Sequence, residues 1–223
     1  MAGVSAGDRR TPSSRRWLAR QQRDPYVVQA RRAGYRSRAA FKLAELDDRF
    51  GFLRPGGRVL DLGAAPGGWA QVAAERVAAK SGQGVVVAVD LLAMPPLPGV
   101  SVLTLDVSLP ASESAIRQAL GGAADVVLSD MAPNASGHAG VDHLRIVALV
   151  EQAAELAWRL LRPGGVFVAK VRQGGAEGDL LRRLKHAFAS VRHAKPKASR
   201  AESAEVYLVA QGFRPAREGE PAT

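Results

Sequence analysis

The chain is 223 residues long, 47% of them are hydrophobic, and none is cysteine. This length suits a single domain with a sizeable core, and the lack of cysteine excludes disulfide bonds, cysteine-ligated zinc and a thiolate nucleophile. The formal net charge is +10, with ten arginines and two aspartates in residues 1–38 and seven cations but no acid in residues 182–200, which predicts a polyanionic partner.

Apolar spacing and turn residues predict strands and helices in regular alternation. In chain order we expect a helix at 37–50 with Ser37 as its N-cap, strand 58–62, helix 68 to about 80, strands 85–89 and 100–105, helix 112–120, strand 125–129, helix 141–161, strand 166–171, a helix through 180–188, and strands 191–193 and 205–210. The longest apolar stretch, 144–161, contains four charged residues, so it is predicted as an amphipathic helix and not as a membrane span. The alternation favours an α/β fold, an open and mostly parallel sheet with helices on both faces.

Chemically useful side chains occur where such a sheet binds its ligands, beyond the carboxyl ends of the strands. The residues at or just after those ends are Gly63, Asp90, Asp106, Asp130 and Lys170. Each carboxylate taken singly is equally consistent with a helix cap or a solvated charge. Their occurrence at several strand ends together predicts a functional site at this rim.

The turn between the first strand and its helix is the predicted cofactor platform. Gly63, Gly67 and Gly68 permit positive φ angles or the close approach of a ligand, and the helix start offers free N–H groups. The spacing matches neither the phosphate loop nor the dinucleotide fingerprint. A ligand with an adenosine end and no pyrophosphate is favoured, and S-adenosylmethionine is the obvious one. The alternative is a turn that only reverses the chain.

Roles for the neighbouring residues follow from their chemistry. Asp90 is placed to accept hydrogen bonds from both ribose hydroxyls, as the acidic residue of a dinucleotide site does. Asp106 is a candidate acceptor for the adenine amino group. Gly67 and Trp69 are candidates for contacts through backbone N–H groups and the indole edge. For Trp69, packing of the helix against the sheet is an equally good alternative.

Methyl transfer is the expected reaction, and the sequence limits the atom that receives the methyl group. Transfer to pyrimidine C5 normally needs a cysteine, which is absent. Transfer to an exocyclic amine usually uses Asn or Asp followed by two prolines and an aromatic, whereas residues 130–134 are Asp-Met-Ala-Pro-Asn. A ribose hydroxyl instead needs a general base and a cation that stabilises the developing oxyanion.

Two lysines are the candidates for these roles. Lys170 can act as the base if its pKa is lowered, and a second ammonium group at Lys42 would lower it. Asp130 and Glu205 would orient the two lysines, but their negative charge raises lysine pKa values. The sequence leaves open which effect dominates.

Several runs of the sequence resemble one known family. The runs are Ser14-Arg15-Arg16-Trp17-Leu18, Tyr35 to Leu43, Asp61 to Trp69, Asp90-Leu91-Leu92, Ser129 to Asn134, Lys170-Val171 and Glu205-Val206-Tyr207. Together they resemble the RrmJ/FtsJ family of bacterial ribosomal RNA large subunit methyltransferase E, from about residue 13 to 213. The resemblance implies a Rossmann-like, S-adenosylmethionine-dependent methyltransferase fold with a seven-stranded sheet. It also implies 2′-O-methylation of a uridine in the A-loop of 23S rRNA in the large ribosomal subunit.

The resemblance also assigns site residues. It implies a catalytic tetrad of Lys42, Asp130, Lys170 and Glu205, with Lys170 as general base. It implies cofactor contacts at Gly67, Trp69, Asp90, Asp106 and Asp130. Gly63, from the predicted cofactor turn, completes the set of candidate cofactor-binding residues. Two features depart from the family: residues 171–175 are Val-Arg-Gln-Gly-Gly, where the family often has an aromatic before Gln-Gly, and the residues after Phe213 are extra.

We expect a disordered basic tail at residues 1–12, a single methyltransferase domain at 13–213 and a disordered tail at 214–223. The expected protein is a cytoplasmic monomer that uses S-adenosylmethionine and acts on large-subunit ribosomal RNA, without a metal and without a membrane contact. Two alternatives stay open. One is a related 2′-O-methyltransferase of transfer RNA or organellar ribosomal RNA, and the other is a non-catalytic RNA-binding factor for ribosome assembly.

Overall fold

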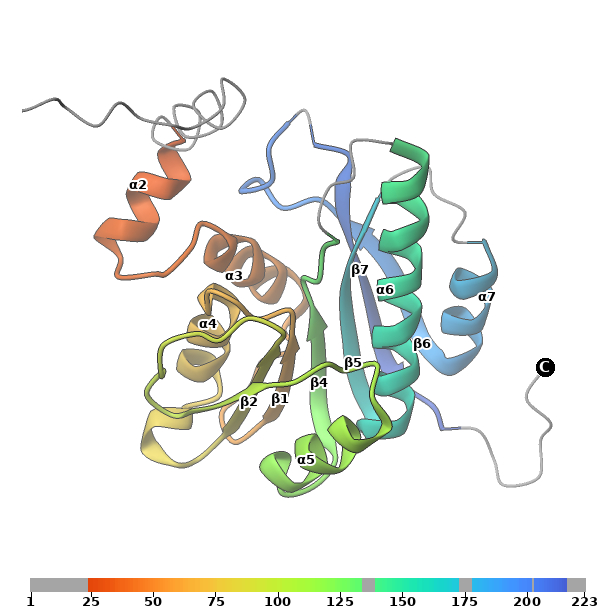
Figure 1. The fold of residues 1–223 in the computed structure, drawn as a ribbon, viewed down its shortest axis with the longest axis horizontal. Coiled ribbons are helices and arrows are strands. Elements are labelled where there is room, and N and C mark those ends of the chain that lie inside the picture. The colour runs from red at the N-terminus through yellow and green to blue at the C-terminus, as the bar shows by residue number, and fades with distance from the viewer. Residues whose placement is uncertain (1–23, 134–138, 173–177, 202, 216–223) are drawn as a thin grey trace, which may run out of the picture.

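The computed structural model describes residues 24–133, 139–172, 178–201 and 203–215. Within these residues, seven strands form one sheet in the order β3-β2-β1-β4-β5-β7-β6 (Figure 1). The strands are β1 (Arg58–Leu62), β2 (Val85–Asp90), β3 (Val100–Thr104), β4 (Ala124–Ser129), β5 (Leu161–Arg172), β6 (Phe188–Ala194) and β7 (Glu205–Phe213). Strands β1 to β5 pair in parallel, whereas β7 runs antiparallel to β5 and β6. The expected open, mostly parallel sheet is confirmed.

Helices cover both faces of this sheet (Figure 1). They are α2 (Pro25–Arg32), α3 (Ala39–Phe50), α4 (Gly68–Arg76), α5 (Pro110–Leu120), α6 (Ala139–Leu160) and α7 (Gly178–Ala187), with a short 3-10 turn η1 (Ala79–Ser81). One core layer lies between the sheet and α5, α6 and α7, and the other lies between the sheet and α3 and α4. In β1, Leu60 and Leu62 belong to the first layer and Val59 to the second. Because both faces are buried, the parallel strands are almost entirely apolar.

The sheet register brings several strand ends to one rim. Leu62 pairs with Val89 of β2 and with Ser129 of β4, which in turn pairs with β5. The residues at or after these ends are 63, 90, 130 and 170. Since β7 is antiparallel to β5, its first residue, Glu205, lies at the same end of the sheet. The strand order changes direction between β1 and β4, which is the switch point where open α/β sheets bind ligands.

The end of α4 and the start of α3 differ from what the sequence predicts. The helix expected at 68–80 ends at Arg76, and η1 follows, because Ala78 has a left-handed backbone with φ +58 that an α-helix cannot continue. Ser37 is not the N-cap of α3, since Arg38 occupies that position.

The Ser37 hydroxyl serves packing instead of capping. It has no hydrogen-bond partner among the described residues. A Cβ on Gly68 would stand 2.2 Å from Ser37 Oγ, so the start of α3 and the start of α4 are in close contact at this point. The contact explains why a glycine opens α4.

Hydrophobic spacing does not predict α2, which instead begins with a local capping signal. The Asp24 carboxylate accepts a hydrogen bond of 3.1 Å from the Tyr26 N–H, and Pro25 occupies the first helical position. An acidic N-cap followed by proline is a typical helix start. The expected tail at 1–12 and most of the one at 214–223 lie outside the described residues. None of the described helices is long and apolar enough to cross a membrane.

Candidate active site

Lys42, Asp130, Lys170 and Glu205 come together from four parts of the chain. Lys42 lies in α3, Asp130 follows β4, Lys170 lies near the end of β5, and Glu205 begins β7. Lys170 Nζ is 3.1 Å from Asp130 Oδ1 and donates a hydrogen bond of 2.7 Å to the Asp130 carbonyl oxygen. Lys42 Nζ is 3.5 Å from Glu205 Oε2. The four side chains therefore form two ion pairs.

Tyr207 joins these two ion pairs. Its hydroxyl donates to Asp130 Oδ1 at 2.9 Å and accepts from Lys42 Nζ at 3.3 Å. Its ring is fully buried and packs on the Trp69 ring, with 5.5 Å between the ring centroids. Tyr207 receives no role from the sequence alone. The available signal is its spacing of two residues from Glu205, which places both side chains on one face of β7.

Burial strengthens the electrostatic interactions of this cluster. The side chains of Lys170 and Lys42 are only 9% and 12% exposed. Burial by itself would raise the pKa of Glu205, but the ammonium groups of Lys42 and Lys170 outweigh it and lower the pKa. Burial and then the charge of Asp130 raise the pKa of Tyr207 well above its usual value. The phenol is therefore protonated at neutral pH and can donate its hydrogen bond.

The glycine turn adjoins this cluster. Gly63 has φ +73, and a Cβ there would lie 2.7 Å from Met131 Cγ and 2.8 Å from Met131 Cα. Only glycine adopts this conformation readily, so the turn can touch the residue that follows Asp130. Gly67, with φ +110, is the N-cap of α4. The first N–H groups of α4 have no partner within the helix.

Asp90 and Asp106 hold backbone groups of their own surroundings. Asp90 Oδ2 accepts from the Ala65 N–H of the glycine turn at 2.9 Å, and Oδ1 accepts from the Leu92 N–H at 2.8 Å. Asp106 Oδ1 accepts from the N–H and the hydroxyl of Ser108 at 2.9 and 2.6 Å, and these bonds lower the pKa of Asp106. A carboxylate oxygen can accept more than one hydrogen bond. A capping role and a ligand role are therefore compatible for both residues.

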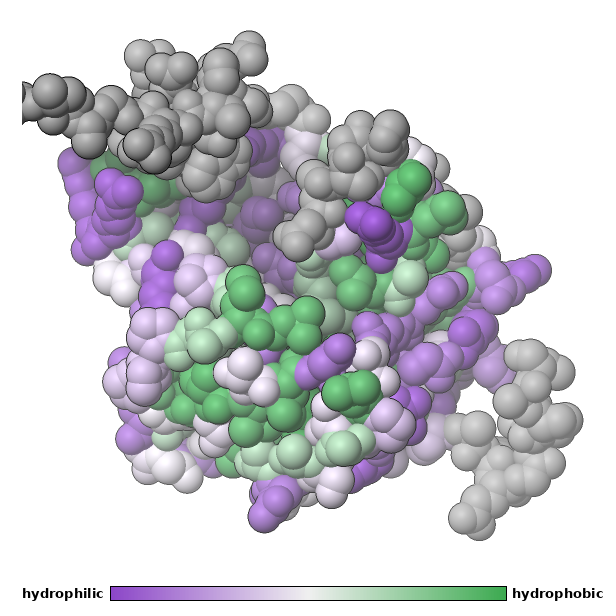
Figure 2. All heavy atoms as spheres, viewed as in Figure 1, coloured by the Kyte–Doolittle hydropathy of each residue, from purple (hydrophilic) through white to green (hydrophobic). Residues whose placement is uncertain are grey.

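Exposed apolar side chains flank these two carboxylates. Leu91, Leu92 and Leu109 are all more than half exposed. Figure 2 shows a hydrophobic patch over the chain that flanks β2 and β3. An apolar ring bound beside Asp90 and Asp106 would cover part of this surface.

A third carboxylate, Asp61 of β1, is fully buried. Neither of its oxygens has a hydrogen-bond partner among the described residues. Burial raises the pKa of Asp61 well above its usual value, the charges of Asp130 and Asp90 raise it further, and the Ala70 N–H of α4 opposes this effect. In the sequence, Asp61 is only a break in an apolar run. Beside the glycine turn, the carboxylates of Asp90 and Asp130 favour a cationic ligand over a pyrophosphate.

The Trp69 side chain packs the helices on the sheet. The residue is buried, and its Nε1 donates to the Ala39 carbonyl at 2.8 Å. Its ring contacts Tyr207 of β7 on the other side. The sequence leaves two alternatives for the Trp69 side chain, helix packing and contact with a cofactor through the indole edge. The burial of the indole agrees with packing and does not agree with an edge that is presented to a cofactor. A contact through the Trp69 N–H stays a prediction.

Arg36, in the first basic segment, makes internal contacts. Its guanidinium donates to the carbonyl oxygens of Pro66, Pro95 and Pro96 at 3.2, 2.8 and 2.8 Å. These bonds connect the glycine turn to the proline-rich loop before β3. Arg36 therefore contributes to the shape of the cofactor platform and not to a free basic surface.

Asp24 connects the two basic segments. Its carboxylate pairs with Arg38 and with Arg200, and Arg38 also donates to a carbonyl in the loop between β6 and β7. Arg38 precedes α3, the helix that carries Lys42. The cations of α2, Arg31 and Arg32, are exposed, and Figure 2 shows hydrophilic side chains over this helix. These exposed cations are available to a polyanion.

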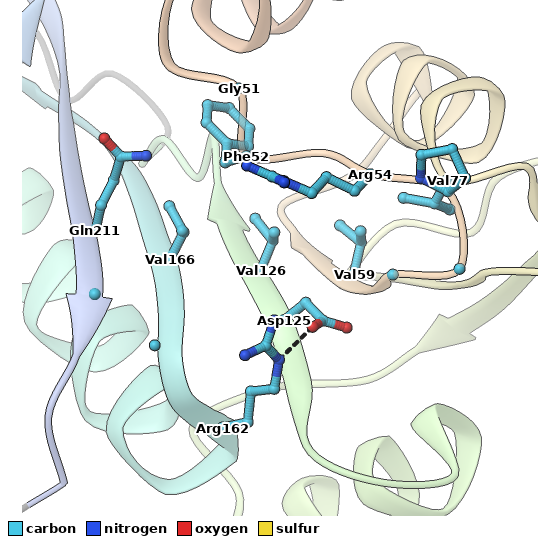
Figure 3. Close-up of a pocket in the computed structure, with 15 residues that line it drawn as sticks. Gly51, Phe52, Arg54, Val59, Val77, Asp125, Val126, Arg162, Val166 and Gln211 are labelled. Atoms are coloured by element: carbon cyan, nitrogen blue, oxygen red, sulfur yellow. Dashed lines mark hydrogen bonds and ion pairs between the residues drawn. The ribbon is translucent and has the colours of Figure 1, made fainter.

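A hollow of about 500 Å³ lies at the amino ends of the strands (Figure 3). Val59, Val126 and Val166 contribute its apolar lining, and an ion pair between Arg162 and Asp125 borders it. None of the predicted site residues lines it. Since ligands of open α/β sheets bind at the opposite rim, we place the candidate site there. In the described part of the chain, no group of three His, Asp or Glu residues is arranged to hold a metal ion.

Known proteins share this fold and sequence. Residues 35–213 match the FtsJ-like methyltransferase family. The chain is 55% identical over 221 residues to a protein of Rhodopseudomonas palustris (strain TIE-1) named ribosomal RNA large subunit methyltransferase E, a match that covers 98% of this chain and 93% of the relative. A solved structure from Plasmodium falciparum, described as a ribosomal RNA methyltransferase, has a TM-score of 0.71 and 30% identity and covers 80% of this chain and 98% of that one. An S-adenosylmethionine-dependent O-methyltransferase from Thermotoga maritima has a TM-score of 0.51 and 15% identity over 79% of this chain and 66% of that one. The Rossmann-like methyltransferase fold is thereby confirmed, and the chain belongs to the FtsJ-like methyltransferase family.

Proposed function

We propose that this protein methylates the ribose 2′ hydroxyl of a uridine in the A-loop of 23S rRNA, within the large ribosomal subunit, with S-adenosylmethionine as methyl donor. Family membership supports methyl transfer, and the name of the R. palustris relative supports large-subunit ribosomal RNA as the substrate. The choice of a ribose hydroxyl rests on one observation, the two largely buried lysines that pair with carboxylates beside the glycine turn. The resemblance to the RrmJ/FtsJ family supplies the uridine and the A-loop.

The rim suits S-adenosylmethionine, which supplies an electrophilic methyl group on a sulfonium cation. The residues that would hold it are Gly63, Gly67, Trp69, Asp90, Asp106 and Asp130. The carboxylates of Asp90 and Asp130 beside the glycine turn support a cationic ligand. The exposed leucines beside Asp90 and Asp106 offer an apolar surface for an adenine ring.

Lys170 is placed to take the proton of the ribose hydroxyl. A neutral lysine amine has two N–H donors and one lone pair. The two donors match the two acceptors of Asp130, the carbonyl oxygen at 2.7 Å and Oδ1 at 3.1 Å. With both bonds made, the lone pair is directed away from Asp130 and is free to accept a proton.

Lys42 would stabilise the negative charge that develops on the ribose oxygen. Its ammonium group is held by Glu205 and by the Tyr207 hydroxyl. We therefore assign Lys42 and Glu205 to charge stabilisation and Lys170, oriented by Asp130, to proton removal.

The test is the Lys170→Met variant, assayed on large subunits from a strain that lacks the enzyme. Formation of 2′-O-methyluridine, measured by mass spectrometry of ribosomal RNA nucleosides, is expected to fall at least about 100-fold, while S-adenosylmethionine still binds. Lys80→Met is the matched control, because Lys80 is exposed in η1 and is not part of the ion-paired cluster. Full activity of Lys170→Met would remove this lysine from the mechanism.

The same assay on other substrates separates the alternatives. Methylation of transfer RNA, with none on large subunits or on deproteinised 23S rRNA, would favour a transfer RNA methyltransferase. Cofactor binding without methyl transfer to any of the three would favour a non-catalytic assembly factor. The cytoplasmic location and the monomeric state stay predictions, which fractionation and analytical ultracentrifugation would check.

A further inference from the structure

Tyr207 occupies the centre of the proposed active site, although it is not part of the tetrad. Hydrogen bonds and ion pairs run without a break in the order Glu205, Lys42, Tyr207, Asp130 and Lys170. Without the Tyr207 hydroxyl, the described contacts form two separate pairs. The hydroxyl is therefore the one group through which the two halves of the cluster are joined by described hydrogen bonds.

Packing fixes the position of this hydroxyl. The Tyr207 ring is fully buried against Trp69, which is itself held by the Ala39 carbonyl of α3. Tyr207 is also the register partner of Lys170 across β5 and β7. A side chain locked by packing on a strand holds a hydrogen bond in a narrower geometry than a side chain on a loop.

Charged groups from every neighbouring element face the hydroxyl or its partners. They are Arg38 and Lys42 around the start of α3, Asp130 after β4, Lys170 of β5 and Glu205 of β7, and the charge of Asp130 also acts on Asp61 of β1. Burial first, and then the charges of Asp130 and Glu205, raise the pKa of the phenol and keep it protonated. Tyr207 therefore donates to Asp130 and leaves its oxygen lone pairs for Lys42.

On the basis of the proposed function, we propose that Tyr207 is a positioning residue that shares Asp130 Oδ1 with Lys170 and connects Lys42 to the base. Asp130 Oδ1 accepts from Tyr207 at 2.9 Å and lies 3.1 Å from Lys170 Nζ. A hydrogen bond from the phenol withdraws negative charge from this oxygen. Asp130 then attracts the Lys170 proton less strongly, and the neutral amine that removes the ribose proton is favoured.

The test is the pH dependence of the single-turnover rate of Tyr207→Phe, a variant that removes the hydroxyl and keeps the ring. We expect the rising limb of the variant's profile to lie about one pH unit above that of the wild type. The variant's rate should therefore be about tenfold lower at pH values below the rising limbs of both proteins, and close to the wild-type rate on the plateau. The dissociation constants of S-adenosylmethionine and RNA should change less than about twofold. Tyr35→Phe is the matched control, because it removes a hydroxyl that bonds to Glu75 at 3.0 Å outside the cluster.

A double-mutant cycle with Lys42→Met adds a second readout. If the hydroxyl connects Lys42 to the base, the rate losses of Lys42→Met and Tyr207→Phe are less than additive, because each variant breaks the same connection. Additive losses with an unshifted profile would refute the proposal.

If Tyr207→Phe does not fold, replacement of Tyr207 by 3-fluorotyrosine keeps the proposal testable. The fluorinated phenol is the stronger donor, so the profile is expected to move to lower pH, and no movement would contradict the proposal. An active Lys170→Met variant would instead remove Lys170 from the mechanism, and a wild-type protein that transfers no methyl group to large subunits would refute the proposed function. An inactive Lys170→Met together with an unshifted Tyr207→Phe would refute only the role of Tyr207.

Discussion

Gly63→Ala tests the contact between the glycine turn and the segment that carries Asp130. The φ of +73 at this position costs a residue with a Cβ about 1–2 kcal/mol. The new Cβ would lie 2.7 to 2.9 Å from three atoms of Met131, two of which belong to the backbone. Relief of such overpacking typically costs about 1–3 kcal/mol. The free energy of unfolding is therefore expected to fall by about 2–5 kcal/mol.

Gly121→Ala is the matched control for this substitution. Gly121 also has a left-handed backbone, with φ +64, but a Cβ there would have no described atom within 4 Å. Only the conformational cost of about 1–2 kcal/mol applies there. In thermal unfolding of a chain of this size, each kcal/mol lowers Tm by about 2–4 °C. Equal losses for the two variants would show that Met131 gives way without cost and would refute the reasoning.

The Gly63 substitution is also expected to reduce activity by more than its effect on stability explains. Relief of the clash must move the Met131 backbone, which adjoins the Asp130 carbonyl that accepts from Lys170 Nζ at 2.7 Å. A displacement of this kind can cost about 100-fold in rate. Single-turnover rates measured where both variants are folded would show the loss for Gly63→Ala, whereas Gly121→Ala is expected to keep the wild-type rate.

Two further substitutions test the platform and the ion pair. Arg36→Met should weaken S-adenosylmethionine binding about tenfold in calorimetry, because the bonds that hold the turn to the proline-rich loop are lost; an unchanged dissociation constant would exclude this role. Glu205→Gln should lower the free energy of unfolding by about 1 kcal/mol or less at neutral pH. Since the pKa of Glu205 is lowered in the folded protein, its carboxylate stabilises the fold above the pKa of the unfolded chain, and this contribution is lost as pH falls through the folded pKa. The Tm values of Glu205→Gln and wild type should therefore converge in acid, and a constant difference would contradict the assignment.

The rim of the site is predictable from the sequence because two general rules locate it. Strands buried on both faces are apolar runs with clear ends, and ligands of such sheets bind beyond the carboxyl ends. Asp90, Asp130 and Lys170 follow from these rules alone. Lys42 and Glu205 are different, because they lie 163 positions apart and no periodicity connects them. Their pairing is expected only through the family resemblance.

The features that the sequence does not predict depend on groups without a sequence signal. Arg36 is of a residue type that often binds RNA. Its guanidinium instead donates hydrogen bonds to backbone carbonyl oxygens, which every residue possesses, so the sequence carries no signal for these contacts. For Trp69, packing and ligand contact both suit an aromatic residue, and the choice depends on the Ala39 carbonyl and the Tyr207 ring from other elements. Ser37 is of a residue type that often caps helices, but its side chain packs against Gly68 and does not cap α3. In each case tertiary contacts override the local preference.

The two sides of the site carry opposite charge, and the proposed reaction needs both. Asp90 and Asp130 lie beside the glycine turn, where a cationic methyl donor is favoured, whereas the Lys42 ammonium group lies on the β7 side, where an anionic RNA is favoured. Asp130 belongs to both sides, because it raises the pKa of Asp61 and pairs with Lys170. In the proposed reaction Lys170 would take the ribose proton, so a positive charge would appear 3.1 Å from Asp130 Oδ1 as the positive charge on the donor side is lost. The net charge around Asp130 is thus the same before and after transfer, so no solvent needs to enter a buried site to compensate for the reaction.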